Sequence, residues 1–310
     1  MKILILGGHG FVGKNIYEML DSSKHRIYNY SRYDGLDLLY PNVTQKYFIE
    51  IDPDVIINCA ADVGSLNYVT RKAAEVLDNN MHMLLNIYSV VQKVVPNAII
   101  INPVANCAYP GNLDFYTEDK FWSGAIHKSV LAYGSTRRMM LILSECYRNQ
   151  YDIRSINYFV PNMYGPYDSS DPDKAHALNA LISKVIKAKK ENRKQLEVWG
   201  TGKVIREWLF AKDYAKIVRD TVEDIDNKIY DEPVNIGQNF GLSVKELVDL
   251  IINETKFEGE ITWNRSMPDG APKKVMDNKM FKKIFPEFKF TEFKEGIQET
   301  IKYYESIYPY

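Results

Sequence analysis

The amino-acid sequence predicts an α/β protein with a doubly wound parallel sheet and a smaller α/β unit after it. A continuous apolar run, KILIL at residues 2–6, is typical of a strand buried on both faces of a parallel sheet. A glycine-rich turn and an amphipathic stretch follow, and the alternation of strand and helix then repeats up to residue 160. After about Asn162 the strands become shorter and the loops more polar.

The elements of the first half follow one another in regular alternation. Strands are expected at 2–6, 25–30, 54–61, 98–104 and 152–160, and helices at 11–20, 71–95 and 129–149. Strands that alternate with helices form βαβ units with right-handed crossovers, and these units build a doubly wound sheet.

The second half begins with a polar loop, YGPYDSSDPDKAH, which leads into a basic helix at 177–191. Further on, a helix is expected at 243–252, between short strands at 233–237 and 261–263. No low-complexity linker separates the halves, so the second should pack directly on the first. We therefore expect a cofactor-binding domain over 1–162, to which later segments return, and a mainly substrate-binding domain over 163–310.

Composition and charge exclude several classes of protein. A formal net charge of −1 over 310 residues gives no overall attraction to nucleic acid or to an anionic membrane. The three cysteines, Cys59, Cys107 and Cys146, are odd in number and lack metal-ligand spacing, so neither a disulfide framework nor a metal site is expected. No stretch approaches 18 apolar residues. We expect a cytoplasmic protein with no membrane segment.

A glycine pattern, Gly7-x-x-Gly10-x-x-Gly13, comes directly after the first strand and opens a helix, with Phe11 and Val12 between its last two glycines. In a dinucleotide-binding fingerprint the first glycine permits a tight turn, the second lets the backbone approach a pyrophosphate, and the third lets helix and strand pack closely. The helix N-terminus favours the negative charge. The pattern predicts a Rossmann-type site for NAD(P)(H).

The end of the second strand bears on the choice between NAD and NADP. A carboxylate near this point binds the ribose hydroxyls of NAD, whereas an arginine accommodates the 2′-phosphate of NADP. Arg32 lies at this point and favours NADP. Asp34 and Asp37 lie close enough to keep NAD open as the alternative.

Several motifs appear in the order expected of one enzyme family. They are GGHGFVG (7–13), NCAYP (106–110), Tyr133 on its helix, PNMYGP (161–166), EVWGTGKVIREWLF (197–210), VNIG (234–237) and PDGAPKK (268–274). With these motifs the chain resembles the extended short-chain dehydrogenase/reductases, and within them the GDP-L-fucose synthases. The resemblance implies reduction of the 4-keto group of a GDP-linked hexose, in some members after epimerisation at C3 and C5. Related bacterial enzymes act at C4 of GDP-heptoses destined for capsule or lipopolysaccharide.

Two positions depart from the family's catalytic triad. Arg137 occupies the position of the family's lysine, four residues after Tyr133. Arginine can supply a fixed charge and bond ribose hydroxyls, but it cannot shuttle a proton. Ala105 occupies the position of a Ser or Thr that hydrogen-bonds the reacting oxygen, and losing such a bond can cost ~10²–10³ in rate. Asn106 is adjacent, but it should point elsewhere if the strand continues.

Other residues acquire roles from the resemblance. Cys107 and His176 match the family's epimerase acid/base pair, and such a pair can exchange protons on opposite faces of a carbon beside a ketone. The substrate contacts of the family correspond to Asn162, Trp199, Arg206 and Lys274. Arginine and lysine suit a diphosphate, and tryptophan suits packing against a sugar or base.

The leading hypothesis is an NAD(P)-dependent oxidoreductase at C4 of a GDP-linked manno-type hexose or heptose, with Tyr133 as acid/base and Arg137 as fixed cation. The direction is open, and because Arg137 should lower the pKa of Tyr133 it favours oxidation of a hydroxyl. The alternatives are a GDP-4-keto-sugar 3,5-epimerase and a catalytically weakened, cofactor-binding regulator or partner subunit. Apolar faces on the helices at 71–95 and 129–149 predict a homodimer, or a tetramer built from dimers.

Overall fold

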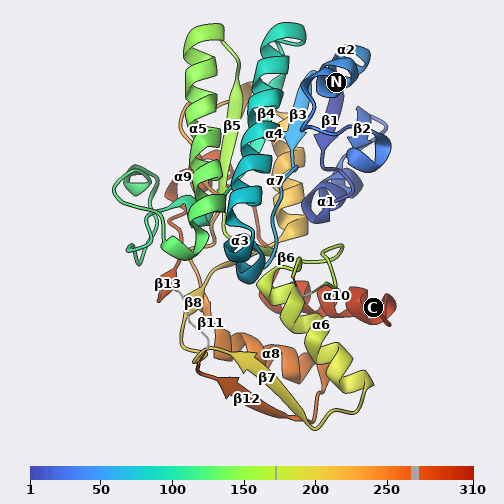
Figure 1. Ribbon diagram of the computed structural model, residues 1–310, viewed down its shortest axis with the longest axis vertical. Helices are drawn as coiled ribbons and strands as arrows, with labels where there is room; N and C mark the ends of the chain where they lie inside the picture. Colours follow the sequence, from blue (N-terminus) through green and yellow to red (C-terminus); the bar gives the residue numbers. More distant parts are fainter. Residues whose placement is uncertain (172, 267–271) are drawn as a thin grey trace.

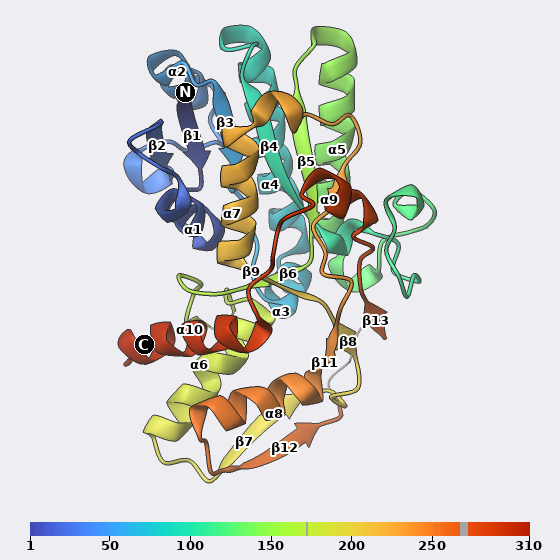
Figure 2. The same cartoon turned by 180° about the vertical axis from the view of Figure 1, so that it is seen from behind.

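The computed structural model describes residues 1–171, 173–266 and 272–310. Two units are visible, one built on a large sheet and a smaller one beyond the carboxyl ends of its strands (Figures 1 and 2). The predicted doubly wound parallel sheet is confirmed. Its six parallel strands lie in the order β10 (Val234–Asn235), β5 (Ser155–Val160), β4 (Ile99–Ala105), β3 (Val55–Asn58), β1 (Lys2–Leu6) and β2 (Arg26–Tyr30).

Helices cover both faces of this sheet. One face carries α2 (Pro41–Ile51), α4 (Ala73–Val94) and α5 (Leu131–Tyr151), and the other carries α1 (Phe11–Met19), α7 (Ala211–Glu223) and α9 (Lys279–Ile284). The central strands β1 and β3 are apolar along almost their whole length because both of their faces are covered. The edge strand β2 is more exposed and also more polar.

The smaller unit has its own apolar core between helices and short strands. Its helices are α6 (Ala177–Lys190), α8 (Val244–Thr255) and α10 (Phe293–Ser306). Its strand groups are β7 (Gln195–Trp199) with β12 (Glu260–Asn264), β6 (Asn162–Tyr164) with β9 (Trp208–Phe210), and β11 (Leu242–Ser243) with β8 (Ile205–Arg206) and β13 (Lys273–Lys274). Two segments beyond residue 162, α7 and β10, belong to the layers of the large sheet.

The expected helix at 71–95 is confirmed as α4, and a separate short helix that the sequence did not predict precedes it. The chain forms α3 (Leu66–Arg71), leaves helical geometry at Lys72, and starts α4 at Ala73. Short 3₁₀ turns also punctuate the loops: η1 (Arg32–Asp34), η2 (Asn106–Ala108), η3 (Glu118–Lys120), η4 (Lys128–Val130) and η5 (Ile225–Asn227). Of these, η1 and η2 follow strands of the large sheet at its carboxyl edge, where the candidate site lies.

A row of asparagines fixes the strands that lead to this edge. Asn58 Nδ2 donates to Asn102 Oδ1 at 3.1 Å, and Asn102 Nδ2 donates to Asn157 Oδ1 at 3.0 Å. Asn102 also donates to the Tyr88 hydroxyl at 3.0 Å, which ties the row to α4. Buried polar groups of this kind specify one arrangement, because any other would leave an amide without a partner.

Candidate active site

The glycine loop after β1 has the geometry that the sequence pattern requires. Gly7 has φ +72°, a left-handed conformation that side chains rarely adopt. A Cβ at Gly13 would lie 2.6 Å from the Gly7 carbonyl oxygen, so only glycine lets α1 approach the strand. The loop and the helix therefore form one closely packed corner.

The N-terminus of α1 has room for a pyrophosphate. A Cβ at Gly10 would meet only the Gly7 oxygen, at 3.2 Å, and no side chain caps the helix. Phe11 is buried and Val12 is partly buried against the apolar core. Uncapped N–H groups at a helix N-terminus favour an anion, so this corner fits the pyrophosphate of NAD(P).

The two carboxylates expected to bind the ribose, near the end of β2, bind groups of the protein instead. Asp34 accepts from the Ser31 backbone N–H at 2.8 Å and lies 3.6 Å from His9, while Asp37 accepts from the Leu39 N–H at 3.0 Å. Arg32 is exposed, and no ion pair involves it among the described residues. An exposed cation with occupied carboxylates beside it is the arrangement that suits a 2′-phosphate.

Tyr133 and Arg137 lie on the first turns of α5. The Arg137 guanidinium carbon is 4.8 Å from the centroid of the Tyr133 ring, so the cation lies over the ring. Arg137 is only 2% exposed, and its Nη2 donates to Asn80 Oδ1 on α4 at 2.9 Å. Asn80 Nδ2 in turn donates to the Asp62 carbonyl at 2.8 Å, which fixes this side chain at the edge of the sheet.

Two opposing effects set the pKa of Tyr133. Burial raises the pKa of Tyr133, and the nearby Arg137 charge lowers it without outweighing the burial. The expected effect of Arg137 is therefore present, but burial leaves the Tyr133 pKa above its ordinary value. At neutral pH the hydroxyl keeps its proton, which suits an acid better than a base.

The segment after β4 faces the start of α5. The strand ends at Ala105, which is half-buried, and the chain turns into η2 at Asn106. A Cβ at Gly134 would lie 3.0 Å from the Cys107 carbonyl oxygen, so α5 and η2 are in direct contact. Burial raises the pKa of the Cys107 thiol, and the charges of Lys274 and Arg137 oppose this shift.

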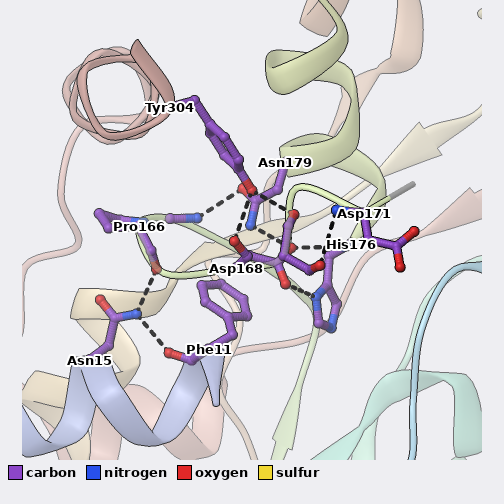
Figure 3. A network of polar contacts seen from close by, with 10 residues as sticks. Phe11, Asn15, Pro166, Asp168, Asp171, His176, Asn179 and Tyr304 are labelled. Atoms are coloured by element: carbon purple, nitrogen blue, oxygen red, sulfur yellow. Dashed lines mark hydrogen bonds and ion pairs between the residues drawn. The ribbon is translucent and has the colours of Figure 1, made fainter. Parts of the chain in front are cut away.

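His176 is held by an aspartate that sequence reasoning missed. Figure 3 shows Asp168 accepting from the His176 backbone N–H at 2.8 Å and lying 3.1 Å from its ring Nδ1. Asn179 Nδ2 donates to the same carboxylate at 2.8 Å. The ring centroid of His176 is 5.3 Å from that of Phe11. The structure thus brings His176 to the cofactor corner, and no contact joins it to Cys107 among the described residues.

In the pair of Asp168 and His176, each side chain shifts the pKa of the other in the direction that favours the charged form. Burial lowers the pKa of His176, but the Asp168 charge and hydrogen bond outweigh it and leave this pKa raised. Burial raises the pKa of Asp168, and His176 and the other donors outweigh it and leave this pKa lowered. No short-range sequence pattern joins residues 168 and 176, so only the folded loop reveals the pair.

The two cations expected to bind the substrate, Arg206 and Lys274, lie side by side. Arg206 on β8 and Lys274 on β13 are partners in the register of parallel strands. Burial lowers the pKa of Lys274, Cys107 opposes this shift, and Arg206 adds to it. Neighbouring cations in a half-buried place are suited to a diphosphate. Residues 268–271 of the PDGAPKK motif lie outside the described residues.

Glu207 is a second buried carboxylate that the sequence did not reveal. It accepts from the backbone N–H groups of Met276 at 2.7 Å and Asn239 at 3.1 Å, and its own N–H donates to the Lys274 carbonyl at 3.1 Å. Burial raises the pKa of Glu207 to about 7. These bonds hold the Lys274 strand beside Arg206.

The other two expected substrate residues lie on other strands, β6 and β7. Asn162 begins β6 and is half-buried, opposite Trp208 in the register. Trp199 ends β7 and is 57% exposed, so its ring is not part of the core. Across residues 1–171, 173–266 and 272–310, no cluster of three metal-binding side chains and no helix fit to cross a membrane is present.

Replacing Asp168 by Asn should lower the pKa of His176, because burial then acts without the compensating charge. A raised histidine pKa stabilises the fold below pH 6.5, the ordinary histidine pKa, and this effect is lost as pH rises through the shifted pKa. A lowered aspartate pKa stabilises the fold above pH 3.8, the ordinary aspartate pKa, and this effect is lost on acidification. The Asp168→Asn variant should therefore lose most stability between pH 3.8 and pH 6.5. NMR titration of the histidine rings and unfolding at several pH values measure both effects.

The matched control is Asp171→Asn, because the exposed Asp171 carboxylate accepts only from the Asp173 backbone among its described hydrogen bonds. This variant should leave the His176 titration unchanged. An unchanged His176 pKa in Asp168→Asn would contradict the assignment.

Comparison with known proteins agrees with this geometry. The model of the "NAD dependent epimerase/dehydratase family" matches residues 3–237. A probable GDP-L-fucose synthase 1 from Oryza sativa subsp. japonica is 28% identical over 304 residues, covering 98% of this chain and 92% of that protein.

Two solved structures are also similar along nearly their whole length. A GDP-6-OMe-4-keto-L-xylo-heptose reductase from C. jejuni has a TM-score of 0.88 at 25% identity and covers 98% of this chain and 97% of the other. A GDP-mannoheptose C4 reductase from Campylobacter jejuni with NADP bound has a TM-score of 0.84 at 25% identity, with 98% of both chains covered. The glycine corner, the Tyr133 helix and the family match over most of the chain lead to one conclusion: the chain belongs to the NAD dependent epimerase/dehydratase family of NAD(P)-dependent, extended short-chain dehydrogenase/reductase enzymes.

Proposed function

We propose that this enzyme reduces the 4-keto group of a GDP-linked manno-type hexose or heptose with NADPH. One observation carries the proposal: the Cys107 segment packs against the tyrosine helix, where a Cβ at Gly134 would lie 3.0 Å from the Cys107 carbonyl oxygen. Burial raises the pKa of the Cys107 thiol, and the charges of both Lys274 and Arg137 oppose this shift. This supports the assignment of the tyrosine helix and the paired cations to one site. The relatives named as GDP-L-fucose synthase and GDP-heptose C4 reductases support the same substrate class.

The protonated state of Tyr133 supports reduction as the direction of the reaction. A buried phenol keeps its proton at neutral pH, so it can give that proton to the ketone oxygen as hydride reaches C4. Arg137 stays charged over the ring and favours the tyrosinate formed during this step. NAD(P)H supplies the hydride. Gly10, Phe11, Val12 and Gly13 would hold its pyrophosphate, and Arg32 the 2′-phosphate.

The runner-up is 3,5-epimerisation by Cys107 and His176. Burial raises the thiol pKa, and Asp168 outweighs burial to raise the histidine pKa, so both shifts favour the protonated forms. Such a pair can donate protons to a sugar carbon, but it lacks a ready base. For this reason we rank reduction first. A catalytically weakened cofactor-binding regulator would not need the Arg206–Lys274 pair.

Replacing Tyr133 by Phe should lower the rate of NADPH oxidation with a GDP-4-keto sugar by about 10²–10⁴-fold, the usual contribution of a positioned acid. The binding of NADPH and GDP should stay unchanged, because the hydroxyl is not needed to hold either. Stopped-flow absorbance of the reduced nicotinamide measures the rate. Full activity of this variant would exclude Tyr133 as the proton donor.

Replacing Lys274 by Met should weaken GDP binding by roughly 10- to 150-fold, because a charge-assisted hydrogen bond contributes about 1.5–3 kcal/mol. Lys273→Met is the matched control, since Lys273 pairs with Ile205 and points to the opposite face of the strand. Calorimetry with GDP measures both affinities. Equal affinity of the two variants would disprove the diphosphate assignment.

We also propose a homodimer through α4 and α5, which lie side by side on one face of the molecule (Figure 1). Five large hydrophobic side chains are exposed on these two helices: Leu77, Leu85, Leu131, Ile142 and Tyr151. Leu85→Glu should reduce the mass in light scattering from two chains to one, because a dimer would bury the new charge. Ile49→Glu, at an exposed apolar residue of α2, should leave the dimer intact. A monomeric parent protein would contradict the proposal.

A further inference from the structure

The missing hydroxyl at Ala105 leaves the reacting oxygen of the proposed reduction without its second hydrogen-bond donor. A methyl group cannot donate, and the neighbouring hydroxyl on α5 is already committed: Thr136 Oγ1 donates to the Tyr133 carbonyl at 2.7 Å. Ser135 lies two residues after Tyr133, and such positions on a helix do not face each other. A donor must therefore come from another element.

Asn106 has an amide donor that nothing in the described chain accepts. The residue is only 3% exposed, and its Nδ2 is buried without a hydrogen-bond partner. Leaving such a donor unpaired is costly, so a native protein keeps few of them. An acceptor brought by the substrate would remove this cost at the moment of binding.

The position of Asn106 is fixed against the tyrosine helix. β4 ends at Ala105, and Asn106 starts η2, where its carbonyl accepts from the Tyr109 backbone N–H at 3.1 Å. On the same turn, Arg138 Nε donates to the Ala108 carbonyl at 2.8 Å. Gly134, next to Tyr133, packs on the Cys107 carbonyl. The amide is thus carried on a segment clamped to the first turns of α5.

We propose that Asn106 is a catalytic residue whose amide N–H binds the C4 oxygen of the sugar, in place of the hydroxyl absent at Ala105. This inference rests on the proposed reduction. In that step C4 gains the hydride, the carbonyl electron pair moves to oxygen, and Tyr133 gives this oxygen its proton. Asn106 keeps both of its amide protons and stabilises the negative charge that develops on the oxygen.

The test compares Asn106→Ala, Ala105→Ser and the double variant in the full chain, with NADPH and a GDP-4-keto sugar. Asn106→Ala should lower kcat by about 10²–10³-fold, the usual cost of losing one such donor. GDP and NADPH dissociation constants and the melting temperature should stay near those of the parent protein. Ala105→Ser in the Asn106→Ala background should restore at least about tenfold of the rate, because it returns a donor to the original position.

Asn112→Ala, at an exposed asparagine further along the same loop, is the matched control and should leave kcat unchanged. Parental kcat in Asn106→Ala would overturn the assignment. A joint fall of kcat, GDP affinity and melting temperature without rescue by Ala105→Ser would overturn it as well, since it marks a structural residue. If the parent protein transfers no hydride, the proposed reduction and this inference both fail. The two outcomes above overturn this inference alone, so the two kinds of failure can be distinguished.

Discussion

Every part of the candidate site depends on one constraint, the common direction of the six strands in the large sheet. Parallel strands bring all their carboxyl ends to one edge, and the loops that follow must meet there. The glycine corner follows β1, Arg32 follows β2, and Ala105 closes β4. Asn162, just beyond β5, carries the chain from this edge into the smaller unit. This edge is therefore where the proposed binding of cofactor and sugar nucleotide brings the two together.

Burial decides how the altered triad behaves. An exposed tyrosine beside a guanidinium would lose its proton more readily, but here burial outweighs the charge and the phenol stays protonated. Arg137 is itself buried against an amide, Asn80, so its charge remains available to the tyrosine. The pair therefore suits one role, that of a proton donor with a fixed cation. The arrangement lacks a hydrogen-bond donor at Ala105, and the unpaired amide of Asn106 is the group suited to replace it.

The sequence predicted what depends on local patterns. The apolar runs of β1 and β3 and the glycine spacing act over a few residues, so the sheet and its nucleotide corner could be foreseen. The short helix α3 could not, because six residues are too few to show a helical repeat of apolar side chains. The pairing of Asp168 with His176 and the protonation of Tyr133 arise from tertiary burial. The assigned roles of Cys107, His176 and the substrate cations remain predictions.

The most direct test of the account follows the hydride itself. The protein is mixed with NADPH that carries deuterium on the transferable position of C4, together with a GDP-linked 4-keto sugar, and the product is analysed by mass spectrometry and NMR. The account predicts one deuterium at C4 of the sugar and one molecule of NADP⁺ for each sugar reduced. A product without deuterium at C4, which instead takes up solvent deuterium at C3 or C5, would contradict reduction and establish the epimerase.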